Sequence, residues 1–209
     1  MITTCPDRPE TIRIILFDLG GVLVEWNGTE ELSTLAGLDF SREDAARFWL
    51  HSPAVRKFES GLCNPEEFGR EAVAELQLGI TPDEWLSLFV SWDRGPLPGA
   101  VELLTELSAT HELGCLSNNN QLHWSRICEK HEFGRFFRRQ YLSHEIGLCK
   151  PDPRIFEFVL DDLGLPPGTV FYLDDSPEIV KSALELGIQA VRAKGVEEVR
   201  GVLTREGLL

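Results

Sequence analysis

The chain has 209 residues, of which 43% are apolar, and a formal net charge of −14, so it can bury the core of one or two domains. Its acidic residues are scattered along the sequence, and such a surface repels phosphate backbones and anionic lipid, which argues against nucleic acid or a membrane as a partner. No apolar run reaches the length of a membrane span, and residues 3–8 lack the pattern of a signal peptide.

The first predicted element is a buried strand over Ile12–Phe17, a β-branched apolar run that ends at Asp18. Leu19, Gly20 and Gly21 follow at once, and the glycines predict a tight turn in which a reacting group can approach the main chain. The carboxylate of Asp18 therefore falls at the carboxyl end of a strand, where open α/β sheets bind their ligands. Alone, an Asp-x-Gly-Gly turn is more often ordinary loop structure.

A helical segment is predicted next, over residues 26–95. Two of its helices begin with an N-cap, a proline and a glutamate three residues after the cap, at Asn64-Pro65 and Thr81-Pro82. Apolar residues then recur at helical spacing and are interpreted as packing: Phe68, Ala72, Leu76, Trp85, Leu88, Phe89 and Trp92.

Beyond residue 95, strands and helices alternate. The predicted helices cover 100–109, 122–130, 153–163 and a segment beginning at Ser176-Pro177, and the predicted strands cover 113–117, 139–142, 170–173 and 188–191. This alternation predicts an α/β fold with a parallel sheet covered by helices on both faces. We therefore expect a Rossmann-like core formed by residues 1–25 and 96–209, interrupted by a helical cap over 26–95.

Four more polar residues fall in loops beyond these strands. Ser117 ends one strand and leads through three asparagines into a helix, which favours anion binding by a hydroxyl and free main-chain amides. Lys150 lies in a proline-bounded loop, and Asp174 and Asp175 close the strand before Ser176. Each of these residues could have a purely structural role, as a helix cap, a solvated lysine or a turn. All of them, however, are expected at the same edge of the sheet as Asp18.

Together these residues predict chemistry on a phosphoryl group. Three carboxylates at neighbouring strand ends would repel one another and keep some of them protonated. A divalent cation removes that conflict, and an oxygen-rich site with few protein ligands suits Mg²⁺ shared with a substrate phosphate. Asp18 is then a suitable nucleophile, ionised at neutral pH, whose acyl phosphate water can open.

The motifs in this order resemble the haloacid dehalogenase (HAD) superfamily over nearly the whole chain. Asp18-Leu19-Gly20-Gly21-Val22 resembles the nucleophile motif, and Leu116-Ser117-Asn118 the second motif. Lys150-Pro151 and Leu173-Asp174-Asp175-Ser176 resemble the third and fourth. Within the superfamily, the chain is similar to the helical-cap branch and to sugar-phosphate phosphatases with an Asp-Leu-Gly opening.

The resemblance implies a central sheet of five parallel strands and hydrolysis of a small phosphate ester through an aspartyl phosphate on Asp18. It implies Mg²⁺ held by Asp18, the Gly20 carbonyl, Asp174 and Asp175. It further implies that the phosphate contacts Ser117, the Asn118 main chain and Lys150, beside the turn at Gly20 and Gly21.

One position departs from the family pattern. Related phosphatases usually carry a second aspartate two residues after the nucleophile, as general acid and base, and here that position is Gly20. A positioned acid typically contributes about 10²–10⁴-fold to rate, so slow turnover or an undemanding leaving group is expected unless the cap supplies a substitute. Glu25, His51 and Glu59 are the candidates for that role, and Trp26, Arg56 and Lys57 lie where cap and core should meet.

The cysteines and the other histidines indicate no second site. Five cysteines, Cys5, Cys63, Cys115, Cys128 and Cys149, include no Cys-x-x-Cys pair and are expected to be reduced thiols in a cytoplasmic protein. The remaining histidines, His111, His123, His131 and His144, lack metal-ligand spacing.

Four functions are compatible with these residues. A Mg²⁺-dependent phosphatase of a small metabolite is favoured over a nearly silent module that binds metal and phosphate, which Gly20 would explain. A 2-haloacid dehalogenase also uses a nucleophilic aspartate, but it needs no metal and does not gather an acid pair such as Asp174-Asp175. A phospho-receiver domain is shorter, lacks a lid and places its acid pair before the phospho-acceptor.

Overall fold

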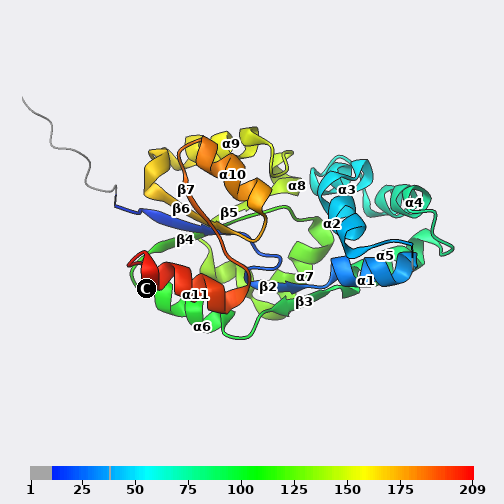
Figure 1. The fold of residues 1–209 in the computed structure, drawn as a ribbon, viewed down its shortest axis with the longest axis horizontal. Coiled ribbons are helices and arrows are strands. Elements are labelled where there is room, and N and C mark those ends of the chain that lie inside the picture. The colour runs from blue at the N-terminus through cyan, green and yellow to red at the C-terminus, as the bar shows by residue number, and fades with distance from the viewer. Residues whose placement is uncertain (1–10, 38) are drawn as a thin grey trace, which may run out of the picture.

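A five-stranded parallel sheet organises the protein. The structure is a computed structural model, and it describes residues 11–37 and 39–209. The strand order is β5-β4-β1-β6-β7, and every neighbouring pair in this sheet is parallel. β1, which ends at Phe17, therefore lies in the centre, and its neighbours are β4 and β6 (Figure 1).

The strands of the main sheet are β1 (Ile14–Phe17), β4 (Glu112–Ser117), β5 (Arg139–Leu142), β6 (Val170–Asp174) and β7 (Gln189–Arg192). The helices that follow or separate them are α6 (Ala100–Leu107), α7 (Gln121–His131), α8 (Ser143–Ile146), α9 (Pro153–Leu163), α10 (Pro177–Glu185) and α11 (Gly195–Arg205), with short 3₁₀ turns η1 (Phe133–Phe136) and η2 (Pro167–Thr169).

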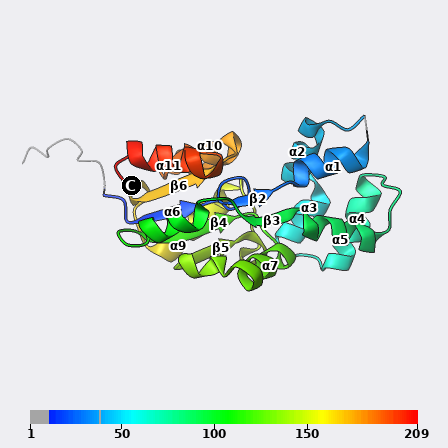
Figure 2. The ribbon, with the colours of Figure 1, turned by 90° about the horizontal axis from the view of Figure 1, so that it is seen from below.

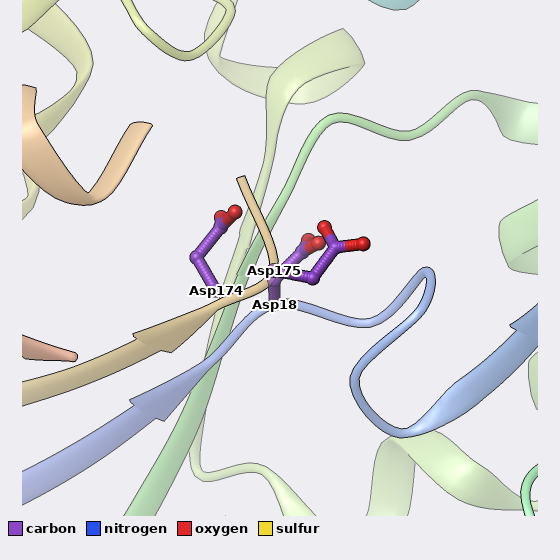
Figure 3. Close-up of side chains that lie close together, drawn as sticks. All are labelled: Asp18, Asp174 and Asp175. Atoms are coloured by element: carbon purple, nitrogen blue, oxygen red, sulfur yellow. The ribbon is translucent and has the colours of Figure 1, made fainter. Parts of the chain in front are cut away.

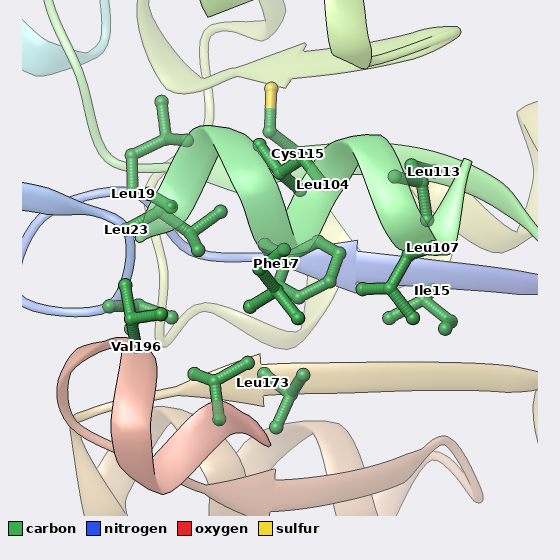
Figure 4. Packing of buried hydrophobic residues seen from close by; sticks show 14 of the residues in the cluster. Ile15, Phe17, Leu19, Leu23, Leu104, Leu107, Leu113, Cys115, Leu173 and Val196 are labelled. Atoms are coloured by element: carbon green, nitrogen blue, oxygen red, sulfur yellow. The ribbon is translucent and has the colours of Figure 1, made fainter. Parts of the chain in front are cut away.

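Helices cover both faces of this sheet because the side chains of β1 alternate between two apolar clusters. Ile15 and Phe17 pack with α6 and α11 on one face (Figure 4), and Ile14 and Leu16 pack with α9 and α10 on the other. All four residues of β1 are buried. Period-two alternation between two apolar layers is what a strand covered on both faces requires.

A group of five helices, which we call the helical cap, lies beside one end of the sheet (Figures 1 and 2). It consists of α1 (Gly28–Ala36), α2 (Arg42–His51), α3 (Pro53–Glu59), α4 (Pro65–Glu75) and α5 (Pro82–Ser91). Its helices surround an apolar cluster of their own. The antiparallel pair β2 (Val24–Trp26) and β3 (Asp93–Pro96) joins it to the rest of the chain.

The predicted α/β fold class with a central parallel sheet and flanking helices is confirmed. Both predicted capping boxes are present: the side chain of Asn64 accepts from the Glu67 amide at 2.9 Å, and that of Thr81 accepts from the Glu84 amide at 3.2 Å. Five of the seven apolar cap residues lie in the cap's core and Leu76 packs against it, but Leu88 is 37% exposed because α5 turns Trp85, Phe89 and Trp92 inward instead.

Other boundaries differ from the sequence expectation by one or two residues, and four elements were not predicted. The first strand begins at Ile14, not Ile12, and the last covers 189–192. Apart from the short 3₁₀ turns, the unpredicted elements are β2, β3, α8 and α11. The first three have only three or four residues each, whereas α11 is a regular helix of 11 residues beyond the last predicted strand. The division of the chain into a core domain and an inserted cap domain at residues 25 and 95 stays a prediction.

Two expectations from the composition can be compared with the structure only over the described residues. Cys63, Cys115, Cys128 and Cys149 are free thiols, while Cys5 and residues 3–8 lie outside the described residues. Within the described residues, none of the helices combines the length and apolar character needed to cross a bilayer.

Candidate active site

Three carboxylates meet beyond the ends of the two adjacent central strands. Asp18 directly follows β1, Asp174 is the last residue of β6, and Asp175 follows it (Figure 3). One oxygen of each lies within 4.8 Å of the others. Asp18 is 8% exposed and Asp174 is fully buried. The parallel register of β1 and β6 causes this juxtaposition, since it aligns Phe17 with Leu173, the residues just before the two acids.

Lys150 supplies the positive charge in this cluster. Its Nζ lies 2.9 Å from Asp18 Oδ1 and 2.7 Å from Asp174 Oδ2, and its side chain is 1% exposed. Burial by itself lowers the pKa of Lys150, but the charges of Asp174 and Asp18 outweigh burial and hold that pKa above its ordinary value. The lysine is therefore a permanent cation between two carboxylates.

Tyr172 is a site residue that the sequence analysis missed. Its hydroxyl donates to Asp174 Oδ2 and accepts from Lys150 Nζ at 2.8 Å. The amide of Ser176 donates to the other Asp174 oxygen at 2.8 Å. A sequence signal was available, because residues two apart on a strand share a face and Tyr172 precedes Asp174 by two.

Burial is the chief cause of a raised pKa at Asp18 and at Asp175. Burial, and next the charges of Asp174 and Asp175, raise the pKa of Asp18 to about 7 against the lowering effect of Lys150. Burial and the charge of Asp174 also raise the pKa of Asp175. Desolvation is thus a larger cause than the mutual repulsion that the sequence predicts. These protein groups alone would leave Asp18 only partly ionised at neutral pH.

Ser117 and Asn118 reach the site from the end of β4. Ser117 is buried, and its hydroxyl lies on the wall of the same cavity as Asp18. The side chain of Asn118 binds the Lys150 main chain twice, with Nδ2 donating to the carbonyl at 3.0 Å and Oδ1 accepting from the amide at 2.8 Å. Asn118 thus fixes the lysine loop to β4, a role that the sequence analysis did not assign.

The start of α7 offers fewer free main-chain amides for an anion than the sequence predicts. Asn120, not Ser117, caps this helix, and its Oδ1 accepts from the amides of Leu122 and His123. The Asn119 amide donates to Ser143 Oγ at 2.9 Å. Among the described residues, the Asn118 amide has no acceptor, so it is available to bind an anion at this edge.

The two glycines after Asp18 differ in how strictly the structure requires a residue without a side chain. Gly21 has φ of 74°, and a Cβ there would stand 2.7 Å from Asp175 Oδ2. Gly20 has an ordinary backbone conformation, and a Cβ there would lie 3.7 Å from the nearest atom, Trp26 Cβ. No donor from the described residues reaches the Gly20 carbonyl oxygen, which leaves it available as a ligand.

The cluster opens into a cavity of about 470 Å³ that both the sheet edge and the helical cap line. This volume falls in the range of small-molecule sites, about 300–1,000 Å³. The cap side is largely aromatic, with Trp26, Trp49 and Phe89 in mutual ring contact. His123 joins them, and burial lowers its pKa to about 4, so its ring is neutral.

The residues proposed at the junction of cap and core separate into two groups. Trp26 and Glu59 line the cavity. Glu25 and His51 are exposed and lie outside it, as does Arg56. Lys57 pairs with Glu71 at 2.5 Å and does not line the cavity. Of the three acid or base candidates from sequence, only Glu59 therefore faces the cluster.

Comparisons with known proteins agree with this geometry. A family model for haloacid dehalogenase-like hydrolases matches residues 12–187. The chain is 25% identical over 204 residues to D-ribitol-5-phosphate phosphatase of Bacteroides thetaiotaomicron, covering 92% of this chain and 97% of that one.

Solved structures extend the likeness to the fold. A HAD family enzyme of Bacteroides thetaiotaomicron superposes with a TM-score of 0.75 at 28% identity, over 93% of this chain and 99% of that one. A second structure of that enzyme, in complex with magnesium and inorganic phosphate, has a TM-score of 0.68 at 28% identity, over 88% and 94% of the two chains. The present chain is a hydrolase that belongs to the haloacid dehalogenase-like family.

Proposed function

We propose that this protein is a Mg²⁺-dependent phosphomonoesterase that hydrolyses a small phosphorylated metabolite, a sugar or sugar-alcohol phosphate, through an aspartyl phosphate on Asp18. The observation that carries the proposal is the buried cluster in which oxygens of Asp18, Asp174 and Asp175 lie within 4.8 Å of one another, with Lys150 2.9 Å from Asp18. The relative named D-ribitol-5-phosphate phosphatase supports the substrate class.

The donor set fits magnesium. Mg²⁺ prefers oxygen ligands and is usually bound by one or two carboxylates together with waters and substrate phosphate. Asp18, Asp175 and the Gly20 carbonyl have oxygens to offer, whereas both oxygens of Asp174 already accept protein hydrogen bonds and Asp174 would share one of them. When bound, the cation neutralises the carboxylates, lowers the pKa of Asp18 and balances charge on the phosphoryl oxygens.

Residues of the chain carry out nucleophilic attack, bind the phosphoryl group and exclude water. The Asp18 carboxylate attacks phosphorus and forms the acyl phosphate. The Lys150 ammonium, the Ser117 hydroxyl and the Asn118 amide bind phosphoryl oxygens, so negative charge is met from several directions. The aromatic cap wall with Trp26 and Trp49 excludes water and contacts the part of the substrate beyond the phosphate.

The test is a screen of sugar and sugar-alcohol phosphates with the purified protein, in Mg²⁺ and in chelator. We expect phosphate release that depends on Mg²⁺ and is lost in Asp18→Asn, which keeps the fold. Asp161→Asn, which changes an exposed acid on α9 in the same way, should behave as wild type. Turnover that survives in Asp18→Asn would remove Asp18 as the nucleophile.

A nearly silent module that binds metal and phosphate is the second candidate, and Gly20 is the observation that favours it. Such a module would bind Mg²⁺ and inorganic phosphate in calorimetry but release no phosphate from any substrate in the screen. Metal-dependent turnover decides for the enzyme.

A further inference from the structure

The site as described lacks a group to protonate the leaving oxygen. Position 20, where related phosphatases carry the acid, is glycine. Lys150 is held by two carboxylates, and Asp174 and Tyr172 are hydrogen-bonded to it and to one another. The leaving-group side of the cavity is the side away from these residues, where the helical cap forms the wall.

Three acids besides the cluster itself line the cavity: Glu30, Glu59 and Asp93. Glu30 is paired with Arg42 at the surface. Asp93 accepts from the Gly95 amide at 2.8 Å, and the charges that influence its pKa are those of Arg126, His131 and Lys130, on α7. Each of these two acids thus has a hydrogen-bond or ion-pair partner of its own, and the charges that act on the pKa of Asp93 do not include that of Asp18.

Among the described residues, Glu59 has no such partner of its own. The charged groups that act on its pKa are Lys150 and Asp18, from the sheet edge, and Arg56, one turn earlier on its own helix. Its carboxyl makes no hydrogen bond or ion pair with any described residue, and it lines the cavity. Glu59 is thus a free carboxyl that belongs to the cap but faces the proposed nucleophile.

Close packing between cap and sheet edge holds Glu59 in this position. It is the last residue of α3, and the next residue, Ser60, places its hydroxyl 3.2 Å from Cys149 Sγ, beside Lys150. At Gly61 a Cβ would stand 2.3 Å from the His144 carbonyl oxygen. The end of α3 is therefore seated on the loop that carries the lysine.

Burial, with a smaller contribution from the charge of Asp18, raises the pKa of Glu59 to about 8, against the lowering effects of Lys150 and Arg56. A carboxyl with such a pKa keeps its proton at neutral pH, as a general acid must before the ester bond breaks.

We propose that Glu59 is the general acid and base of this hydrolase, supplied by the helical cap in place of the aspartate that is absent at position 20. The inference rests on the proposed phosphatase function and adds to it. It makes cap docking a condition for protonation of the leaving group, so that a substrate without the docked cap has no proton donor.

The proposed reaction has two steps. As an oxygen of Asp18 bonds to phosphorus, the bond between phosphorus and the ester oxygen breaks, and that oxygen takes the proton of Glu59 and leaves as the alcohol. Water then bonds to phosphorus while Glu59, now a carboxylate, takes one of its protons. The bond between phosphorus and Asp18 breaks, which releases inorganic phosphate and restores both residues.

Leaving-group dependence tests the role. For Glu59→Gln we expect kcat/KM to fall about 10²–10⁴-fold with an alkyl phosphate from the screen, whose alkoxide needs a proton. With p-nitrophenyl phosphate, whose phenolate leaves unprotonated, kcat/KM should fall by less than about tenfold. Glu25→Gln, at an exposed acid outside the cavity, is the matched control and should match wild type on both substrates.

Rescue gives a second, independent readout. Gly20→Asp introduces an acid at a position with ordinary backbone and room for a Cβ. In the Glu59→Gln background it should restore kcat/KM for the alkyl phosphate at least tenfold. Mg²⁺ affinity in calorimetry should be the same for Glu59→Gln and wild type, because Glu59 is outside the three-carboxylate cluster.

Equal losses on both substrates, or no loss on the alkyl phosphate, would overturn the role of Glu59. Either result leaves the proposed phosphatase function in place as long as wild type turns over with Mg²⁺ and Asp18→Asn does not. A changed Mg²⁺ affinity in Glu59→Gln would reassign the residue to metal binding.

Discussion

Gly21 and Asp175 lie so close that a methyl group at position 21 would overlap the carboxylate: the Cβ position is 2.7 Å from Oδ2 and 3.2 Å from Cγ. The turn after β1 and the end of β6 are therefore matched in shape as well as in charge. A glycine read from sequence as a turn former also makes room for one of the three clustered acids.

Gly21→Ala should weaken the binding of Mg²⁺. The new Cβ displaces Asp175, and the φ of 74° at this position adds about 1–2 kcal/mol of strain for a residue with a side chain. Since altered metal ligation commonly costs about 10–100-fold in affinity, we expect a loss in that range by titration calorimetry.

Gly201→Ala is the control for that variant. Gly201 lies in α11 with no atom near its Cβ position. Alanine there should leave metal affinity unchanged and stabilise the helix by about 0.5–1 kcal/mol. Wild-type affinity in Gly21→Ala would mean that Asp175 does not contribute to metal binding.

Tyr172→Phe should destabilise the protein even though it removes a single oxygen. That oxygen donates to Asp174 and accepts from Lys150, both fully buried charges. Hydrogen bonds to charged groups contribute about 1.5–3 kcal/mol, so the free energy of unfolding in urea should fall by that amount. Tyr141→Phe, which removes a bond to the exposed Asp162, should cost less. Equal losses in the two variants would contradict the special role of the buried phenol.

Much of this site follows from local sequence patterns. The positions of Asp18, Ser117 and the acid pair at strand ends, and of Lys150 in a loop, were predicted because β-branched apolar runs broken by polar residues mark where buried strands end. The structure brings these residues together around one cavity, and their roles in catalysis stay predictions.

The contacts that hold the site together could not be predicted from the sequence because they join distant segments. The side chain of Asn118 binds the main chain of a residue 32 positions away, and no local sequence pattern predicts such a pairing. Glu59 is one of three candidates for the general acid that the sequence offers. Only the docking of α3 on the lysine loop distinguishes it from the other two, Glu25 and His51. The capping of α7 by Asn120 also depended on where the helix begins, which sequence patterns fix only to within a few residues.

Lys150→Met should lose turnover and much of the protein's stability. Without the ammonium, the carboxylates of Asp18 and Asp174 remain buried with no cation, and breaking a buried pair typically costs about 3–5 kcal/mol. Urea unfolding in chelator should show this loss, and Mg²⁺ should recover part of it. Lys181→Met, which breaks an exposed pair with Glu185, should change stability by no more than about 0.5 kcal/mol. Wild-type stability in Lys150→Met would refute the pairing.

Gly61→Ala should disturb cap docking and slow turnover of alkyl phosphates. The Cβ would meet the His144 carbonyl at 2.3 Å, a backbone atom that cannot move aside cheaply. A misplacement of about 1 Å can cost 10²-fold in rate, so kcat/KM for an alkyl phosphate should fall by about that factor. Gly164→Ala has a similar φ, 60° against 68°, but open space around its Cβ position. It should carry the strain without the loss of rate, and equal effects in the two variants would show that docking at Gly61 does not matter.

The pH dependence of stability should report the proton on Glu59. Its pKa is about 8 in the folded protein against an ordinary value of 4.5, so folding favours the protonated form. The stability that this proton contributes is complete below pH 4.5 and is lost as the pH rises through 8. Each pKa unit corresponds to about 1.4 kcal/mol, and the partial exposure of the side chain reduces the effect, so we expect a contribution of about 1–3 kcal/mol.

Glu59→Gln has no proton to lose, so its unfolding free energy should decline less than that of wild type between about pH 5 and pH 9. The measurement is urea unfolding in chelator across this range, and the difference between the two proteins removes the shared titration of Asp18 and Asp175. Glu25→Gln should keep the wild-type slope, since Glu25 is exposed. Parallel curves for wild type and Glu59→Gln would mean that Glu59 is already ionised at neutral pH, because an acid with an ordinary pKa leaves no proton for the folded state to hold.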